Sequence, residues 1–215
     1  MTAMIHPVLP TRFEELRTAD LRDLRTIASN ALQSAQGMPF QQHPLGFLFR
    51  TLQDTGDRRV RLHVWPPGAQ TSNLGYDIHD HAFSFVSRTL AGVVRHSSFN
   101  VHPQQAATEH VLYEVLYEGQ ISTLRKTDRF VLVSDDSSQI ISPGESYELS
   151  HVAFHSTQAL GTAGAATLTV MERTSSACPL VVGPSDGPES LEFARVAPDL
   201  QLVKSAGAIL FPPET

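Results

Sequence analysis

The stretch Tyr76–Gly92, YDIHDHAFSFVSRTLAG, holds two histidines, His79 and His81, followed by a run that ends at a glycine. Successive side chains of a β-strand point to opposite faces, so residues two apart share a face. If this stretch is a strand, both imidazoles lie on one side of it, close enough to bind one metal ion at ~2.0–2.2 Å per nitrogen. Two surface histidines in a loop are the alternative interpretation of the pair.

A second histidine segment follows later in the chain, as PGESYELSHVAFH over residues 143–155. It contains His151 and His155, whose shared parity would let either one point the same way along a single strand. The sequence therefore predicts that one of them completes a metal site with the first pair. A His151 that lines the pocket without binding the metal could act as a general acid or base near neutral pH.

The pattern of apolar residues changes near Leu45, from helical spacing to short alternating runs. In residues 11–35, apolar residues recur at helical spacing, which predicts one or two amphipathic helices, with Thr18 or Asp20 able to cap a restart. Later runs such as SFVSRTLAG and TLTVMERT are short and separated by turn-forming residues, which predicts about eight to ten strands and no parallel α/β sheet. The expected fold class is all-β, as a sandwich or barrel.

We expect a single domain overall, with a helical extension over residues 1–44, a barrel over 45–173 and an irregular wrap over 174–215. The chain has 215 residues, 41% of them hydrophobic, which suits one sizeable core and is too short for two ordinary domains. Within the last part, LQLVK at Leu200–Lys204 is the one segment read as a further strand.

Charge and composition exclude several classes of partner. The 22 Asp and Glu against 16 Lys and Arg give a net charge of −6, so no basic field attracts nucleic acid. No run approaches the ~20 apolar residues of a membrane span, and no secretory signal opens the chain, so the expected location is cytoplasmic, away from any membrane. The one cysteine, Cys178, can form no intramolecular disulfide. A homodimer is left open.

The run Val60–Trp65, VRLHVW, alternates apolar and polar residues. His63 falls on the face opposite the apolar residues. If the apolar face of this strand lines the barrel, His63 lies at the surface, and this is the interpretation that alternation favours.

A strand-rich chain with HxH on one strand and a further histidine after a Pro-Gly turn resembles the cupin superfamily, here from about Leu45 to Arg173. The resemblance implies a cupin fold, a double-stranded β-helix or jelly-roll barrel, with the helices as an amino-terminal extension. The usual cupin glutamate, four or five residues after the second histidine, is replaced by Phe85 and Val86. The site should therefore be three-His, which among cupins points to the thiol dioxygenases of the cysteine dioxygenase type.

Other residues extend this resemblance to the thiol dioxygenases. The family's IHDH motif with a later serine matches Ile78–His81 and Ser84, and its barrel glycine matches Gly92. Its tyrosine, eight residues before a ligand histidine, matches Tyr147 and His155, which favours His155 as the third metal ligand beside His79 and His81.

Two further positions concern the substrate. The family's arginine for the substrate carboxylate, at a strand end before a glycine-containing turn, matches Arg50 in LFRTLQDTGD. The family's catalytic tyrosine on the last barrel strand has no counterpart, because TLTVMERT offers Met171 there. Arg50, Tyr147 and His151 are therefore the expected catalytic residues, and cysteine itself is expected to be a poor substrate.

The resemblance implies a mononuclear non-haem Fe(II) dioxygenase that uses O2 on a small thiol or other chelating, carboxylate-bearing metabolite. Three neutral imidazoles leave a divalent ion its whole charge and open positions, which suits Fe(II), the expected metal. The same ligands suit Zn(II) or another divalent metal. The alternatives are a zinc-dependent cupin with non-oxidative isomerase, lyase or heteroatom bond-forming chemistry, and a non-catalytic small-molecule-binding cupin.

Overall fold

A computed structural model describes residues 7–34, 38–67, 75–194, 197–198 and 200–210. These residues form three helices, which are α1 (Phe13–Thr18), α2 (Leu21–Gln33) and α3 (Leu200–Leu210). The strands are β1 (Gln41–Gln42), β2 (Leu48–Asp54), β3 (Arg58–Trp65), β4 (Phe83–Ala91), β5 (Val93–Gln104), β6 (His110–Glu118), β7 (Ile121–Ile141), β8 (Ser146–Leu149), β9 (Phe154–Leu160), β10 (Ala165–Arg173), β11 (Leu180–Pro184) and β12 (Ser190–Ala194).

The amino-terminal helices form where helical spacing predicted them. A break at Ala19 and Asp20 separates α1 from α2, and the Asp20 carboxylate accepts hydrogen bonds from the backbone N–H groups of Arg22 and Asp23, at 2.8 and 3.2 Å. An aspartate at this position satisfies donors that have no partner inside the helix. The predicted restart at Asp20 is therefore confirmed.

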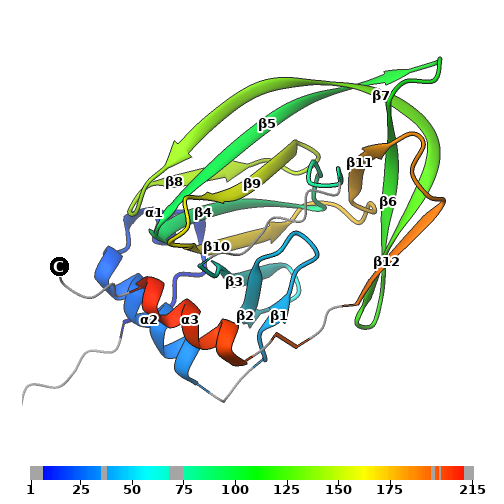
Figure 1. The fold of residues 1–215 in the computed structure, drawn as a ribbon. Helices are drawn as coiled ribbons and strands as arrows, with labels where there is room; N and C mark the ends of the chain where they lie inside the picture. Colours follow the sequence, from blue (N-terminus) through cyan, green and yellow to red (C-terminus); the bar gives the residue numbers. More distant parts are fainter. Residues whose placement is uncertain (1–6, 35–37, 68–74, 195–196, 199, 211–215) are drawn as a thin grey trace, which may run out of the picture.

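The strands form two antiparallel sheets (Figure 1). The first, which we call sheet A, has the order β1-β2-β3-β10-β4-β8. The second, sheet B, has the order β11-β6-β7-β5-β9, with β12 added to β7. The long strands β5 and β7 arch over the rest of the molecule in Figure 1.

The pairing of these strands is nested, as in a hairpin rolled up on itself. From the outside inward, β3 pairs with β10, an isolated bridge at His79 pairs with His155 of β9, β4 pairs with β8, and β5 pairs with β7. This first-with-last order is that of a jelly roll. The predicted all-β jelly-roll barrel with a helical extension is confirmed.

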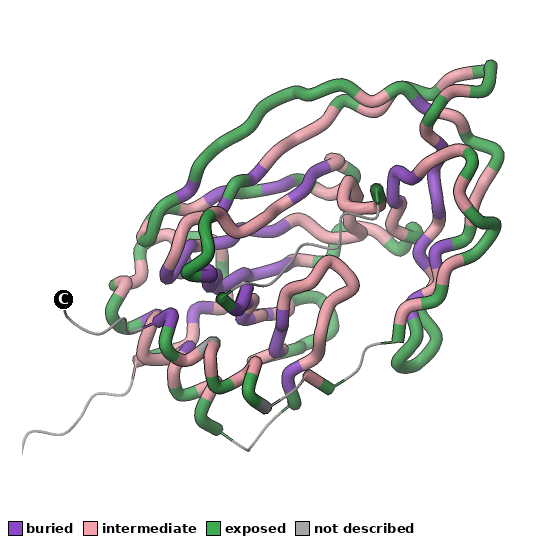
Figure 2. The backbone as a smooth tube through the Cα atoms, viewed as in Figure 1, coloured by how far each residue is buried: buried purple, intermediate pink, exposed green. Residues whose placement is uncertain are grey.

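The central strands of sheet A, β10 and β4, are buried along most of their length. The outer face of sheet A packs on the three helices. Apolar side chains from alternate positions of the strands contact the buried side chains of the helices there. The residues of this layer include Leu16, Leu24 and Ala28 from the first two helices, Ile209 and Leu210 from α3, and Leu48, Val60, Leu62, Val64, Val86, Leu168 and Val170 from the strands. Figure 2 shows the buried positions concentrated in this part, while much of the β7 arch is exposed.

The carboxy-terminal segment corrects one expectation. Residues 174–215 were expected to be irregular with a strand at LQLVK, but the chain forms β11, β12 and α3, and LQLVK begins that helix. Ile209 and Leu210 are buried against the outer face of sheet A, and this tertiary contact outweighs the alternation of Leu200 and Leu202. In the parts of the chain that the structure describes, no helix is both long and apolar enough to span a membrane.

Candidate metal centre

Three histidines meet inside the barrel because two distant segments pair through their backbones. The His79 N–H donates to the His155 carbonyl at 3.0 Å, and the His155 N–H donates to the His79 carbonyl at 2.9 Å. This bridge places the start of the HxH motif directly beside β9. The side chain of His81, two residues after His79, points to the same side of the chain as that of His79. Its ring centroid lies 4.7 Å from that of His79 and 5.0 Å from that of His155.

The ligand atoms of His79, His81 and His155 all lie within 4.8 Å of one another. The Nε2 atoms of His81 and His155 are 2.9 Å apart. Two nitrogens bound ~2.1 Å from one ion lie about 3.0 Å apart at right angles and about 3.4 Å apart at the tetrahedral angle. The donor set and its spacing therefore fit a single divalent ion.

Hydrogen bonds on the outer side of the His79 and His155 rings hold them in orientation. His79 Nδ1 lies 2.9 Å from the Asp77 carbonyl oxygen, which can only accept, so Nδ1 carries the proton and Nε2 keeps its lone pair. On the other side of the centre, His155 Nδ1 lies 3.5 Å from the Thr157 hydroxyl. Such outer contacts orient imidazole ligands toward a metal.

Burial also keeps these imidazoles neutral. Desolvation lowers the pKa of His79, and it lowers the pKa values of His81 and His155 well below the usual range, where neighbouring histidines reinforce the effect. Because only a neutral imidazole offers its lone pair, all three side chains are in the metal-binding form at neutral pH.

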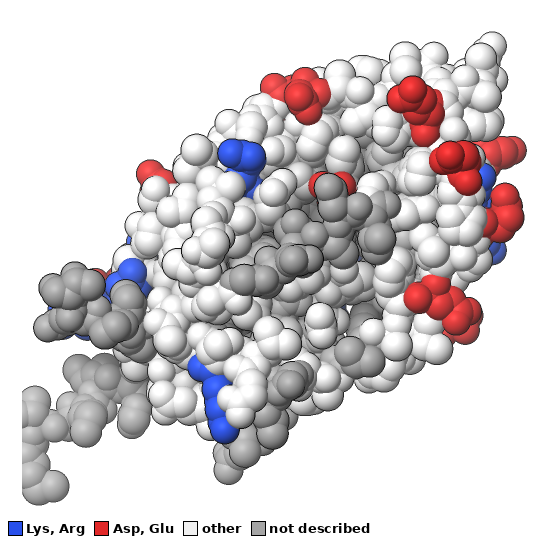
Figure 3. Space-filling model, viewed as in Figure 1, with Lys and Arg blue, Asp and Glu red and all other residues white. Residues whose placement is uncertain are grey.

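The centre opens onto a small cavity of about 80 Å³ between the sheets. Its walls are mostly aromatic or imidazole rings, and Arg61 is the one Lys or Arg among the described residues that line it, with no Asp or Glu. The lining residues are His43, Leu45, Phe47, Arg61, His63, Trp65, His79, His81, Phe83, Phe85, Tyr147, His155, Thr157, Thr169 and Met171. Acidic side chains instead gather on the surface, toward the end formed by β6, β7 and β12 (Figure 3).

The prediction that His63 lies at the surface is wrong. On β3 the apolar residues Val60, Leu62 and Val64 face the helices, so the alternate positions, including His63, face the cavity. Burial there, helped by the charge of Arg61, lowers the pKa of His63 to about 3. Alternation identified the two faces of this strand correctly and assigned them to the wrong sides.

The structure does not place Arg50 in the cavity. Its Nη1 donates to the carbonyls of Ala31 and Ser34 at the end of α2, the second at 2.9 Å, and its Cζ lies 5.6 Å from the centre of the Phe40 ring. The Arg50 side chain thus binds the last helical carbonyls on the outer side of sheet A. The cation in the cavity is Arg61, which the sequence analysis missed, although the alternation RLHVW puts it on the face of His63 and Trp65.

His151 also lies outside the histidine cluster. Strand β8 ends at Leu149, and a turn that includes Val152, with a positive φ of 61°, precedes β9. The two histidines of this segment are therefore not on one strand, and their parity argument does not apply. The His151 N–H donates to the Ser84 hydroxyl at 3.1 Å, and the histidine of this segment that joins His79 and His81 is His155.

Tyr147, by contrast, does line the cavity. Its ring is buried, stacks on His96 at 4.5 Å and meets the edge of Phe85. Burial raises the pKa of Tyr147, so the phenol stays protonated at neutral pH. The cavity thus contains a phenol from β8, while Met171 occupies the position on β10 where the resemblance led us to look for one.

Comparison with known proteins gives structural neighbours only. No family model and no curated protein matches the chain. KdgF from Halomonas sp. is 15% identical over 63% of this chain and 87% of its own, with a TM-score of 0.36. A structure from work on the DMSP lyases RdDddP and RnDddQII is 15% identical over 82% and 80%, with a TM-score of 0.43.

A third neighbour, an RmlC-like cupin from Shewanella frigidimarina, is 14% identical over 66% of this chain and 89% of its own, with a TM-score of 0.31. The fold assignment and the candidate centre therefore rest on the strand pairing and side-chain geometry of this chain itself. The more specific resemblance to the thiol dioxygenases stays a prediction.

Proposed function

We propose that this chain is a metal-dependent enzyme, a mononuclear non-haem Fe(II) dioxygenase that acts on a small, chelating, anionic metabolite. The observation that carries the proposal is the convergence of His79, His81 and His155 in a cavity whose described lining has no carboxylate.

The donor set supports Fe(II). Three neutral imidazoles would hold a divalent ion without offsetting its double charge, and Fe(II) held in this way would supply oxygen chemistry for a chelating substrate. His79, His81 and His155 would hold the ion through their inward nitrogens. The surrounding rings, among them Phe83 and Phe85, shield the centre from bulk water.

Arg61 supports an anionic substrate. Its Nε donates to the Thr51 hydroxyl at 3.3 Å, and its Cζ lies 4.7 Å from the centre of the Phe49 ring, so the guanidinium is held beside the cavity. With no acid among the described lining residues, the cavity field is positive, and it favours a carboxylate or another compact anion. Arg61 takes the role that the resemblance assigned to Arg50.

Tyr147 would hold a proton at its phenol oxygen. The phenol is neutral at pH 7 and lines the same cavity as the three histidines. A buried phenol can donate to a substrate atom that gains negative charge, with no need of solvent.

The second candidate is a zinc-dependent cupin with non-oxidative chemistry. Two observations favour it. Three histidine ligands with one position left open are a common catalytic zinc set. In addition, Met171 occupies the position on β10 where the thiol dioxygenases have their catalytic tyrosine. In this case Arg61 would bind the same class of anion.

The experiment that separates the two loads metal-free protein with Fe(II) under anaerobic conditions and follows O2 uptake. Substrates should be small thiols that carry a carboxylate, cysteine among them, together with non-thiol chelating acids. We expect O2 uptake that depends on both Fe(II) and substrate and is absent from the His79→Ala variant. If the iron-loaded protein uses no O2 with any of these, while the purified protein carries stoichiometric zinc, the dioxygenase proposal fails and the zinc enzyme replaces it.

A further inference from the structure

The hydroxyl of Thr157 lies at a junction behind the candidate centre. Thr157 is two residues after His155 on β9, so both side chains point into the barrel, and its register partner on β5 is His96. Its Oγ1 lies 3.5 Å from His155 Nδ1 and 3.2 Å from His96 Nδ1.

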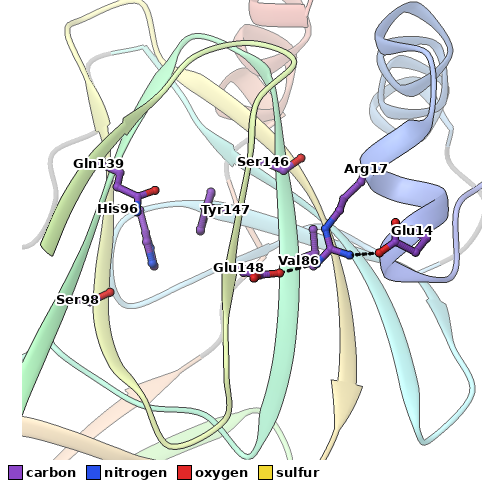
Figure 4. Close-up of a pocket in the computed structure, with 9 residues that line it drawn as sticks. All are labelled: Glu14, Arg17, Val86, His96, Ser98, Gln139, Ser146, Tyr147 and Glu148. Carbon is purple, nitrogen blue, oxygen red and sulfur yellow. Dashed lines mark hydrogen bonds and ion pairs between the residues drawn. The ribbon is translucent and has the colours of Figure 1, made fainter.

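On the far side of this junction is a second cavity, of about 680 Å³. It is lined mainly by polar side chains, and Figure 4 shows them with His96 and Tyr147 on one side and an ion-paired Arg17 between two glutamates on the other. Tyr147 lines both cavities. Thr157 therefore connects a candidate metal ligand to a histidine in the wall of a separate, larger cavity.

The donor and the acceptor of each hydrogen bond at Thr157 can be assigned, starting from the metal. The Nε2 of His155 faces the Nε2 of His81 at 2.9 Å, so a metal held there takes the lone pair of His155 Nε2. A neutral imidazole bound in this way carries its proton at Nδ1, which must donate to Thr157 Oγ1. A hydroxyl has one proton, so Thr157 can then donate to His96 Nδ1, which leaves the proton of neutral His96 on Nε2.

We propose that Thr157 is a positioning residue that orients His155 toward the metal and, by the same hydroxyl, sets the tautomer of His96. This inference rests on the proposed metal function, but it concerns the protein's own hydrogen bonds. Tyr147 lines the same cavity, and a phenol proton donated to the remaining lone pair of Thr157 would leave this assignment unchanged.

The first test measures the affinity of the full-length, metal-free protein for Zn(II) alone, by competition with a chromophoric chelator. Thr157→Val keeps the branched shape and removes the hydroxyl, and we expect about 10-fold weaker binding. Thr157→Ser restores the hydroxyl and should restore most of the affinity, which a purely structural role for the methyl group would not produce.

The matched control is Thr167→Val, on β10. Thr167 is fully buried inside the same fold, and its hydroxyl has no hydrogen-bond partner among the described residues. Its Zn(II) affinity should equal that of the wild type. Equal affinities for wild type and Thr157→Val would overturn the positioning role, provided that both bind one Zn(II).

The second test needs no variant. In 15N spectra of the Zn(II)-bound, histidine-labelled wild type, we expect His96 to be protonated at Nε2 and His155 at Nδ1. Protonation of His96 at Nδ1 would mean that Thr157 does not donate to His96, and it would overturn the coupling between the two residues. A wild type that binds no Zn(II) or Fe(II) would overturn the metal function as well, so the two failures are distinguishable.

Discussion

Arg50 and Arg61 lie on adjacent strands, and their side chains point to opposite faces of sheet A. In the β2–β3 register Arg50 is opposite Leu62, which faces the helices, and Arg61 is opposite Thr51. Because directly paired residues share a face, one arginine belongs to the helix layer and the other to the cavity. We therefore expect the two positive charges to have separable roles, Arg50 in stability and Arg61 in binding.

Replacing Arg50 should weaken the fold and spare the centre. Arg50→Met removes charged donors from the carbonyls at the end of α2 and should lower the free energy of unfolding by about 1.5–3 kcal/mol. Urea denaturation measures this loss, and metal stoichiometry at low temperature should be unchanged. A stable Arg50→Met protein that had lost substrate use would restore the original assignment of Arg50 to the substrate.

Replacing Arg61 should do the reverse. Arg61→Met keeps the long side chain and removes the charge, so the metal should remain while kcat/KM for an anionic substrate falls by about one to two decades, the equivalent of ~1.5–3 kcal/mol. Arg58→Met, an exposed arginine on the same strand that pairs with Glu172, is the control and should leave kcat/KM unchanged. An Arg61→Met enzyme with full activity would exclude Arg61 from substrate binding.

The three clustered histidines should each be needed for the metal. We expect His79→Ala, His81→Ala or His155→Ala to abolish stoichiometric metal binding, because two remaining imidazoles hold a divalent ion weakly. His151→Ala should keep the full metal content, since His151 is not part of the cluster. Elemental analysis after equilibrium dialysis makes the comparison, and full occupancy in the cluster variants would refute the assignment.

The sequence predicted the features that depend on local spacing. Two histidines in an HxH motif share a face whatever the rest of the fold does, and short alternating runs indicated a barrel. The preference for His155 came from its spacing to Tyr147, and the structure does bring both residues to the cavity. These features needed no knowledge of what packs against the strands.

Which face of sheet A lines the cavity depends on what packs against the strands, and the prediction of that face was wrong. The usual rule assigns the apolar face of a strand to the barrel interior, but here the helices cover the other face and take the apolar residues Leu62 and Val64. The cavity face could then hold Arg61 and His63. The helix at Leu200–Leu210 was missed for a related reason, since its burial against α2 and sheet A is a long-range contact.

Acid should destabilise the metal-free protein below about pH 6.5. Burial lowers the folded-state pKa of His63 to about 3 and lowers those of the clustered histidines, whereas an unfolded histidine titrates near ~6.5. Between these values the unfolded chain binds more protons, so the free energy of unfolding falls as the pH falls, by about 1.4 kcal/mol per pH unit for each histidine that stays neutral. Above pH 6.5 this contribution is constant.

Urea titrations of chelator-treated protein between pH 7.5 and 5.5 test this expectation, in a range where most carboxylates stay ionised. His63→Phe should have a shallower pH dependence than the wild type, because one buried titrating group is gone. A wild-type stability that does not change over this interval would contradict the neutral burial of the histidines.

Gly92, in the turn between β4 and β5, should tolerate no side chain. Its φ is +67°, and a Cβ there would lie 2.1 Å from the Gly164 carbonyl oxygen and 2.7 Å from the Ala165 Cα. Gly119 has a similar φ of +59°, with nothing within 4 Å of an added Cβ. A substitution there therefore measures the cost of the positive φ alone. Gly119→Ala should cost about 1–2 kcal/mol of stability, the penalty of a left-handed L-residue.

Gly92→Ala should cost that amount and at least ~1–3 kcal/mol more, because backbone atoms of the β9–β10 turn must move to relieve the overlap. The shift would reach the cavity through Ala165, which packs in one buried cluster with Phe85 and Tyr147. We therefore expect Gly92→Ala to lower both the urea midpoint and the metal affinity, while Gly119→Ala lowers the midpoint alone. Equal losses of stability in the two variants would contradict the close approach of Gly92 to Gly164 and Ala165.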